Sequence, residues 1–157
     1  MKTVKSKRTK NILLLITMLL VTLCLSSCES VKENALVVEK EEKPIKIVIK
    51  FDAKGDLITK MKQESTVDLE NVSEDQIKQL EDSCSEYEKR YKKLGFVDYK
   101  FGVEDNVFKE KISFEATEEN VKKLKEENLL PVSEDDNRIG LKATKEFFEK
   151  DGYKVVK

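Results

Sequence analysis

Apolar residues recur at every second position from Ile45 to Phe51, which predicts the first β-strand of a folded domain. A turn-forming segment around Gly55 follows, because glycine readily adopts the positive φ of a tight hairpin. A second turn is expected at Glu104–Asn106. Three more strands show apolar residues on one face, over about residues 57–69, 97–103 and 108–116. Two hairpins of this kind indicate an antiparallel sheet.

The clearest helix signals lie between residues 73 and 94. Ser73 and Gln76 have the spacing of a capping box, in which each side chain binds a backbone N–H group of the other residue. Gly95 stands where a left-handed residue would end the helix. Apolar residues recur at intervals of three and four, which predicts one buried face: Ile77, Leu80, Cys84, Tyr87, Tyr91 and Leu94. Cys84 lies within this stripe, so we expect it to be a small buried hydrophobic residue.

The remainder of the chain predicts two shorter helices. Thr117 can cap the first, which must end before Pro131, and the second is expected over about residues 143–150. Short strands are expected at Ile139–Leu141 and, as an edge strand, at Val155–Val156. The order ββ-α-ββ-α-α predicts an α+β fold, a two-layer sandwich of a mainly antiparallel sheet with helices on one face.

The N-terminus has the pattern of a lipoprotein signal peptide over residues 1–27. A basic leader precedes the uncharged stretch Ile12–Leu25, which is shorter than the roughly 20 residues that span a bilayer. Leu25, Ser26, Ser27 and Cys28 then have the pattern of a lipobox, with cleavage expected between Ser27 and Cys28. The Cys28 thiol would carry a diacylglyceryl group, whose acyl chains of the palmitate type anchor the protein. The alternative is an uncleaved anchor helix in which Cys28 is an ordinary cysteine.

This pattern predicts a protein held on the extracytoplasmic side of the cell membrane. We interpret residues 28–44 as the lipidated cysteine followed by a charged, flexible tether, of about 20–25 Å at coil dimensions. Residues 45–157 then form a single folded domain. We expect a monomer.

Composition excludes several functions. From Cys28 onward the chain has 25 basic and 31 acidic side chains, a net charge of −6, which argues against nucleic acid as a partner. The chain contains no histidine, so Ser-His, Cys-His and His-metal chemistry are absent. The acidic segment Ser133–Asn137 lacks the spacing of a calcium loop, and we interpret it as a solvated turn. No metal or cofactor is expected other than the covalent lipid.

Glu110 is the most unusual residue in the pattern, because it shares the inward strand face with Phe108 and Ile112. Matching the inward residues of the hairpin sets Phe101 opposite Glu110, with Tyr99 on the diagonal. An unpaired buried charge costs several kcal/mol, so this carboxylate must reach water or find partners.

Several arrangements of Glu110 remain open. It could lie at an open rim, or accept hydrogen bonds from Tyr99, Gln63 or a lysine. It could instead line a small polar ligand pocket with Gln63 and Thr59. A β-bulge near Lys109 would turn it outward.

Two classes of function are compatible with these features. The first is a non-catalytic module that binds an envelope protein, a cell-wall component or a small ligand. The second is a small envelope hydrolase that uses carboxylates, and a concave site with two or more carboxylates of raised pKa would favour it. The absence of histidine and of a nucleophile motif favours the first class.

The chain resembles the YehR-like bacterial lipoproteins, a family of unknown molecular function. The resemblance rests on these features: the Cys28 lipobox, the Lys54-Gly55-Asp56 hairpin, Gln63, the 73–94 helix with Gly95, Glu110, and the closing Phe147-Phe148 to Gly152-Tyr153 segment. It implies a lipid-anchored location and a two-layer α+β fold, and it implies no reaction.

Overall fold

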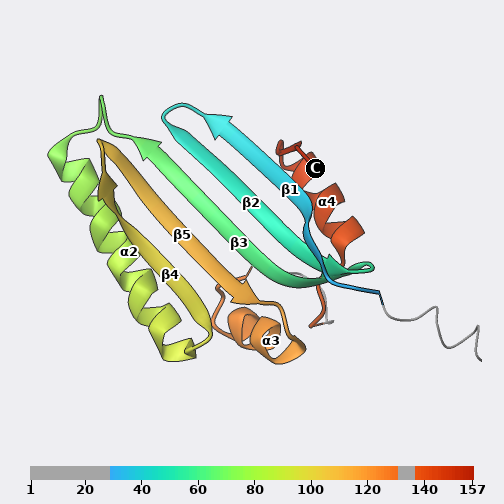
Figure 1. Cartoon of the computed structure of the whole chain (residues 1–157). Coiled ribbons are helices and arrows are strands. Elements are labelled where there is room, and N and C mark those ends of the chain that lie inside the picture. Colours follow the sequence, from blue (N-terminus) through green and yellow to red (C-terminus); the bar gives the residue numbers. More distant parts are fainter. Residues whose placement is uncertain (1–28, 131–136) are drawn as a thin grey trace, which may run out of the picture. The chain divides into compact units, whose positions relative to one another are not determined.

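The folded unit is built on one six-stranded sheet whose neighbouring strands are all antiparallel, in the order β4-β5-β3-β2-β1-β6 (Figure 1). A computed structural model describes residues 29–130 and 137–157, and the folded unit begins at Val31. The strands are β1 (Lys32–Glu42), β2 (Ile45–Lys54), β3 (Leu57–Asp68), β4 (Val97–Glu104), β5 (Val107–Glu115) and β6 (Lys154–Val155).

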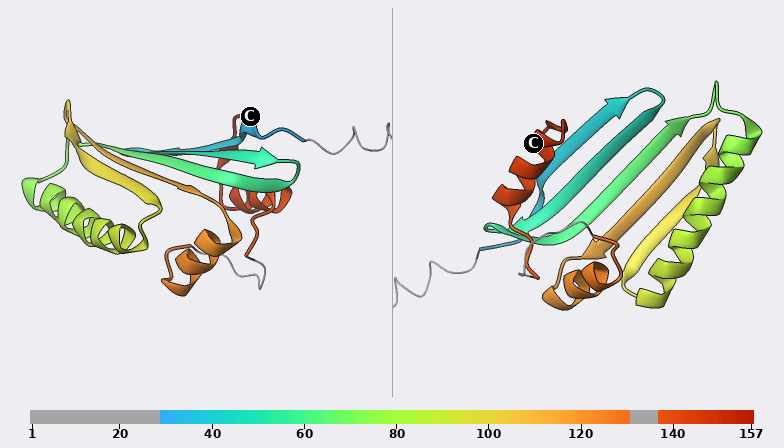
Figure 2. Two further views of the ribbon diagram at one scale, coloured as in Figure 1. Left: turned by 60° about the horizontal axis from the view of Figure 1, so that its bottom comes forward. Right: turned by 180° about the vertical axis from the view of Figure 1, so that it is seen from behind.

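The helices of the described residues all lie on one face of this sheet (Figure 2). They are α2 (Glu74–Leu94), α3 (Glu118–Glu126) and α4 (Leu141–Lys150). Helix α2 packs on β4 at one end of the sheet, and α4 packs on β1 and β6 at the other. The predicted α+β architecture, with its antiparallel sheet and its helices on one face, is confirmed.

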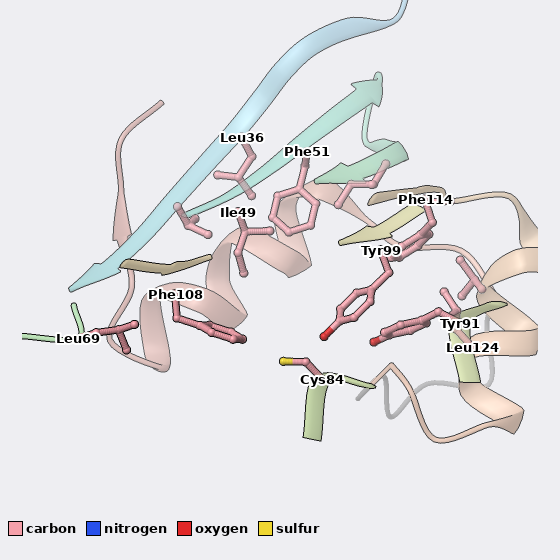
Figure 3. Close-up of a cluster of buried hydrophobic side chains, with 14 residues drawn as sticks. Leu36, Ile49, Phe51, Leu69, Cys84, Tyr91, Tyr99, Phe108, Phe114 and Leu124 are labelled. Carbon is pink, nitrogen blue, oxygen red and sulfur yellow. The ribbon is translucent and has the colours of Figure 1, made fainter. Parts of the chain in front are cut away.

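The core lies between the helices and the covered sheet face. The side chains that are most completely buried come from β1, β3 and α3: Val38, Ile58, Val121 and Leu124. Aromatic rings from β2, β4, β5 and α2 fill the space around them (Figure 3): Phe51, Tyr91, Tyr99, Phe108 and Phe114. Burial of these rings supplies much of the hydrophobic driving force for folding.

The β4–β5 hairpin has the register that the sequence predicted. Asp105 and Asn106 both have positive φ, 51° and 61°, as a two-residue type I′ turn requires. Val103 therefore pairs with Phe108, and Phe101 pairs with Glu110. Glu110 points to the covered face, and the possibility that a bulge turns it outward is excluded.

Helix α2 begins and ends where its signals indicated. The Ser73 side chain accepts the Gln76 N–H, and the Gln76 side chain accepts the Ser73 N–H, which confirms the capping box. Gly95 ends the helix with φ of 75°, and its N–H donates to the Tyr91 carbonyl. Cys84 is buried, as expected.

The flexible tether predicted for residues 28–44 is wrong for most of its length, because residues 32–42 form strand β1. This strand pairs with β2 on one side and with β6 on the other. Leu36 and Val38 enter the core opposite Phe51 and Ile49. Most of the charged residues that suggested a tether occupy the uncovered face and the ends of the strand. Lys40 lies on the covered side, where its ammonium donates to the Asp151 carbonyl at 3.0 Å and lies 5.5 Å from the Tyr153 ring centroid.

Smaller corrections concern the ends of elements. The alternation predicts that Leu57 shares the inward face of β3 with Met61 and Val67, but a register shift between β2 and β3 buries Ile58 and leaves Leu57 exposed. The expected strand at residues 139–141 is reduced to one bridge between Gly140 and Leu57. The last helix starts two residues earlier than predicted, whereas β6 confirms the expected edge strand.

The uncovered sheet face is covered with charged side chains instead of helices. Lysines and carboxylates alternate across its strands and form ion pairs, among them Lys60–Glu115 at 2.7 Å and Lys111–Glu64 at 3.4 Å. Asp52 is the buried exception. Its carboxylate accepts the Asn34 N–H of an irregular turn in β1 at 2.8 Å and the Lys62 ammonium at 3.1 Å. Asp52 thus fixes β1 to the centre of the sheet.

The predicted signal peptide (residues 1–27), the Cys28 lipidation site and most of the Ser133–Asn137 segment lie outside the described residues. Within the described residues, none of the helices has the length and apolar character needed to cross a membrane.

Candidate ligand pocket

A pocket of about 470 Å³ lies beside Glu110, between helix α2 and the segment that follows α3. Its lining residues come from three separate parts of the fold: Tyr87, Tyr91, Glu110, Asn128, Leu129 and Leu130. The volume falls within the usual range for small-molecule sites. Glu110 supplies the carboxylate of the pocket, and the two tyrosines and two leucines supply apolar surface.

Glu110 is held in place by a hydrogen bond within its own hairpin. The Tyr99 hydroxyl donates to Glu110 Oε1 at 2.6 Å, from the diagonal position that the register predicted. Burial and the hydrogen bonds with Cys84 and Glu110 raise the pKa of Tyr99, so its hydroxyl stays protonated and donates. Tyr99 is buried and Glu110 is half-buried, so this bond lies at the inner end of the pocket.

The thiol of Cys84 continues this polar chain into the core. Burial raises the pKa of Cys84, against the effect of its hydrogen bond with Tyr99, and the charge of Glu110 raises it further. The thiol is therefore protonated and can donate to the Tyr99 hydroxyl. Figure 3 shows the hydroxyls of Tyr91 and Tyr99 at the ends of their rings that face the Cys84 side.

Tyr91 is close enough to respond to the same carboxylate. Burial, followed by the negative charge of Glu110, raises the pKa of Tyr91. The Tyr91 and Tyr99 rings pack at 4.9 Å between centroids, and the Tyr87 ring stacks on Tyr91 at 6.2 Å. A row of aromatic rings thus leads from the surface of α2 to Glu110.

The outer wall is formed by the chain after α3. Asn128 has φ of 53°, a conformation that asparagine tolerates well, and it turns the chain at the helix end. The Leu129 N–H donates a hydrogen bond to the Leu124 carbonyl at 2.8 Å. Arg90 of α2 donates to the Glu127 carbonyl and lies 5.8 Å from the Tyr87 ring centroid, so it joins the helix to this wall.

The structure brings together only part of the candidate site predicted from the sequence. Tyr99 binds Glu110, but Gln63 and Thr59 do not line the pocket. Gln63 pairs in register with Ile112, and its amide donates to Ser65 at 3.1 Å. Thr59 lies beside Ala116, about 20 Å along β5 from Glu110 at the usual rise per residue.

Sequence reasoning missed the other lining residues. Tyr87 and Tyr91 were expected in the apolar stripe of α2, but Tyr87 is 44% exposed and its ring is free to form a pocket wall. A tyrosine in an apolar stripe is a weak indication of a binding site, because tyrosines are also common at the edge of a hydrophobic core, where the ring is buried and the hydroxyl reaches water. The approach of Asn128–Leu130 to α2 is a tertiary contact with no local signal.

The pocket contains a single carboxylate, so the paired acids that would favour a hydrolase are not brought together there. In the described part of the chain, no group of three or more acidic or cysteine residues could hold a metal ion. Three carboxyls of the described residues have a clearly shifted pKa: Asp52, Glu104 and Glu119. In each of them, lysine partners or a backbone hydrogen bond lower the pKa. These carboxyls belong to the uncovered face or to α3, away from the pocket lining.

A second hollow, of about 380 Å³, lies on the uncovered sheet face. Its lining includes Lys62, Glu64 and Lys111, whose charges are already paired with neighbouring side chains. Since these charged side chains already neutralise one another, the pocket beside Glu110, whose carboxylate has no ion pair in the described residues, is the better candidate site.

Comparisons with known proteins agree with the fold. A family model described as "Protein of unknown function (DUF1307)" matches residues 37–154. The NMR structure of the E. coli YehR protein superposes with a TM-score of 0.64 and is 20% identical, covering 82% of this chain and 94% of that chain. No curated protein sequence matches. These findings confirm the predicted resemblance to YehR-like proteins, and the structural likeness establishes the fold alone.

Proposed function

Because the chain belongs to the family of proteins of unknown function matched over residues 37–154, we propose its role from its own sequence and pocket. It is a lipid-anchored lipoprotein on the extracytoplasmic side of the cell envelope. Its folded domain is a non-catalytic binding module that uses the pocket beside Glu110. Its partner is an envelope protein, a cell-wall component or a small ligand, and nucleic acid is not among its partners.

The anchoring part of the proposal is supported by the N-terminal sequence. The basic leader, the short apolar stretch and the Leu25–Cys28 lipobox occur in the order that lipoprotein maturation requires. Two or more acyl chains on Cys28 would hold the domain stably at the bilayer, where one chain would not. The net charge of −6 after residue 27 makes attraction to anionic lipid weak, so the lipid supplies the attachment.

The binding part is carried by one observation: a half-buried carboxylate, Glu110, lines a pocket of about 470 Å³ with aromatic and aliphatic walls. A purely structural carboxylate would have its partners within the fold. The Glu110 carboxylate accepts one hydrogen bond, from Tyr99, and has no ion pair with the lysines and arginines of residues 29–130 and 137–157. A polar group in an apolar pocket of this kind fixes the orientation of a ligand.

The test of the anchor is Cys28→Ala in intact cells. We expect the variant to lose lipid attachment, which metabolic labelling with a palmitate analogue measures, and to remain as a precursor or appear in the medium. Cys84→Ala is the matched control, because it removes a thiol that lies outside the lipobox. Normal labelling and membrane retention of Cys28→Ala would disprove the lipoprotein assignment.

The test of the binding module is site-specific photocrosslinking in intact cells. A benzophenone side chain replaces Tyr87 at the pocket or Phe147 on α4, an exposed aromatic residue that is not in the pocket lining. We expect an adduct from position 87 that is absent from position 147. Leu129→Trp, which fills the pocket, should abolish it. An adduct that forms equally at both positions, or none at position 87, would contradict the proposal.

A further inference from the structure

We propose that the pocket beside Glu110 binds a primary alkylammonium group, with Glu110, Tyr91 and Asn128 as its oxygen acceptors and Leu129 and Leu130 against its alkyl chain. This inference rests on the proposed binding function and names its ligand class. The group could belong to a free amine or to a lysine side chain of a partner polypeptide.

The first argument is charge. The Glu110 carboxylate receives its hydrogen bond from a neutral phenol, and its neighbours Cys84 and Tyr91 are neutral as well. In the part of the chain that the structure describes, no lysine or arginine forms an ion pair with it. The nearby Arg90 is held by the Glu127 carbonyl and the Tyr87 ring instead. A cationic ligand would supply the missing partner of a half-buried carboxylate.

The second argument is the number of free acceptors. Within the described residues, the side chains of Tyr91 and Asn128 make no hydrogen bond. Asn128 is exposed, and the Tyr91 hydroxyl is not a fully buried atom without a partner, so both oxygens are available to a ligand in the pocket that they line. A primary ammonium carries three N–H donors and no acceptor. Glu110, Tyr91 and Asn128 offer three oxygens, one from each of the three elements that form the pocket.

The third argument concerns the walls. Leu129 and Leu130 give the pocket an apolar side that suits methylene groups. The Tyr87 ring lies at the exposed end, where an aromatic face attracts a cation as it enters. The ring already has the Arg90 guanidinium 5.8 Å from its centroid, which shows that its environment accommodates positive charge. A sugar or an anion would leave the Glu110 charge uncompensated.

The test uses the intrinsic fluorescence of the full chain, purified from membranes in detergent micelles. The protein has four tyrosines and no tryptophan, and three of the tyrosines, at positions 87, 91 and 99, belong to the pocket and its Glu110 anchor. Titration with n-butylammonium chloride should give a saturable change with a millimolar Kd. At matched ionic strength n-butanol, sodium butyrate, tetramethylammonium and N-acetylglucosamine should bind at least about tenfold more weakly.

Two variants and one control locate the binding. Glu110→Gln should weaken butylammonium binding by about tenfold or more, because a charge-assisted bond becomes a neutral one. Asn128→Gly keeps the positive φ and removes one acceptor, so it should weaken binding severalfold without altering the thermal unfolding midpoint. Glu64→Gln, on the uncovered face, should leave the Kd unchanged.

A second arm separates the two sources of the amine. A capped Ala-Lys-Ala peptide that binds more tightly than butylammonium would identify a polypeptide lysine, whereas its exclusion from the pocket would identify a free amine. Equal binding of butanol or N-acetylglucosamine, or unchanged binding by Glu110→Gln, would overturn the ammonium assignment. If amines fail and the photocrosslink at position 87 persists, the ligand class is wrong and the binding module stands. If both fail, the proposed function is wrong as well.

Discussion

The Tyr99 hydroxyl donates a 2.6 Å hydrogen bond to Glu110 Oε1 across the diagonal of the β4–β5 hairpin. The residue directly opposite Glu110 is Phe101, which has no hydrogen-bonding group. Tyr99 can reach the carboxylate because it is one inward position away on the neighbouring strand. The bond fixes one carboxylate oxygen and leaves the other available to the pocket.

Tyr99→Phe should lower the free energy of unfolding by about 1–3 kcal/mol, since it removes the only hydrogen bond to the Glu110 carboxylate in the described residues and the hydroxyl with which the Cys84 thiol interacts. Urea unfolding measures this change. In a double-mutant cycle with Glu110→Gln, the coupling energy should be about 1 kcal/mol or more.

Tyr87→Phe is the control for that experiment, because it removes the hydroxyl of an exposed tyrosine that stacks on the same row of rings. Its effect on stability should stay within about 0.5 kcal/mol. Equal losses from Tyr99→Phe and Tyr87→Phe would mean that the bond to Glu110 contributes nothing specific.

Cys84 should react slowly with thiol reagents in the native protein. Its side chain is 7% exposed and burial raises its pKa, so both access and thiolate population are low. Mass spectrometry of the peptide that contains Cys84 should show modification within minutes in urea and much slower modification without it. Rapid labelling of the folded protein would show that α2 opens locally or that this residue has a reactive role.

Val38→Ala tests whether β1 belongs to the folded domain. Val38 is fully buried between Ile49 and Val155, so the cavity should cost about 1–3 kcal/mol in urea unfolding. Val31→Ala, at an exposed valine just before the strand, should cost less than about 0.5 kcal/mol. Amide hydrogen exchange of β1 should be as slow as that of β2, whereas a flexible tether would exchange at once.

Asp52 should contribute to acid unfolding. Burial alone would raise its pKa, but the hydrogen bonds from Asn34 and Lys62 and the charge of Lys60 outweigh burial and lower it. The pKa is thus lower in the folded chain than the value of about 3.9 in the unfolded one. The stabilisation from Asp52 is fully present when the pH is above the pKa of the unfolded chain. It is lost as the pH falls from that pKa toward the lower pKa of the folded chain.

Asp52→Asn should therefore destabilise the protein by about 1–3 kcal/mol at neutral pH and should flatten the loss of stability between about pH 5 and pH 2. Asp98→Asn, at an exposed carboxylate on the same face, should change neither. If the stability of Asp52→Asn falls as steeply on acidification as that of the wild type, Asp52 does not contribute to acid unfolding.

The parts of the fold that were predictable from sequence depend on neighbouring residues. The hairpin register followed from Asp105 and Asn106 and from matching Val103 with Phe108, so Glu110 could be placed on the covered face beside Tyr99. The capping box at Ser73 is likewise complete within four residues. Such signals are local, and their geometry allows few alternatives.

The features that escaped prediction depend on distant residues. Only Leu36 and Val38 of β1 enter the core, and the strand is secured by Val155, more than a hundred positions away. The outer wall of the pocket likewise needs the chain after α3 to fold back on α2, through Asn128. Neither contact produces a periodicity that a short sequence window can detect.

The position at which β1 begins limits how far the domain can move if Cys28 carries the lipid. The strand starts at Lys32, so the linker has only four peptide units and spans at most about 14 Å, against the 20–25 Å of a tether reaching to residue 44. A linker of this length keeps the domain close to the lipid headgroups. A partner in a more distant envelope layer would then have to extend to the membrane, since the module cannot extend to it.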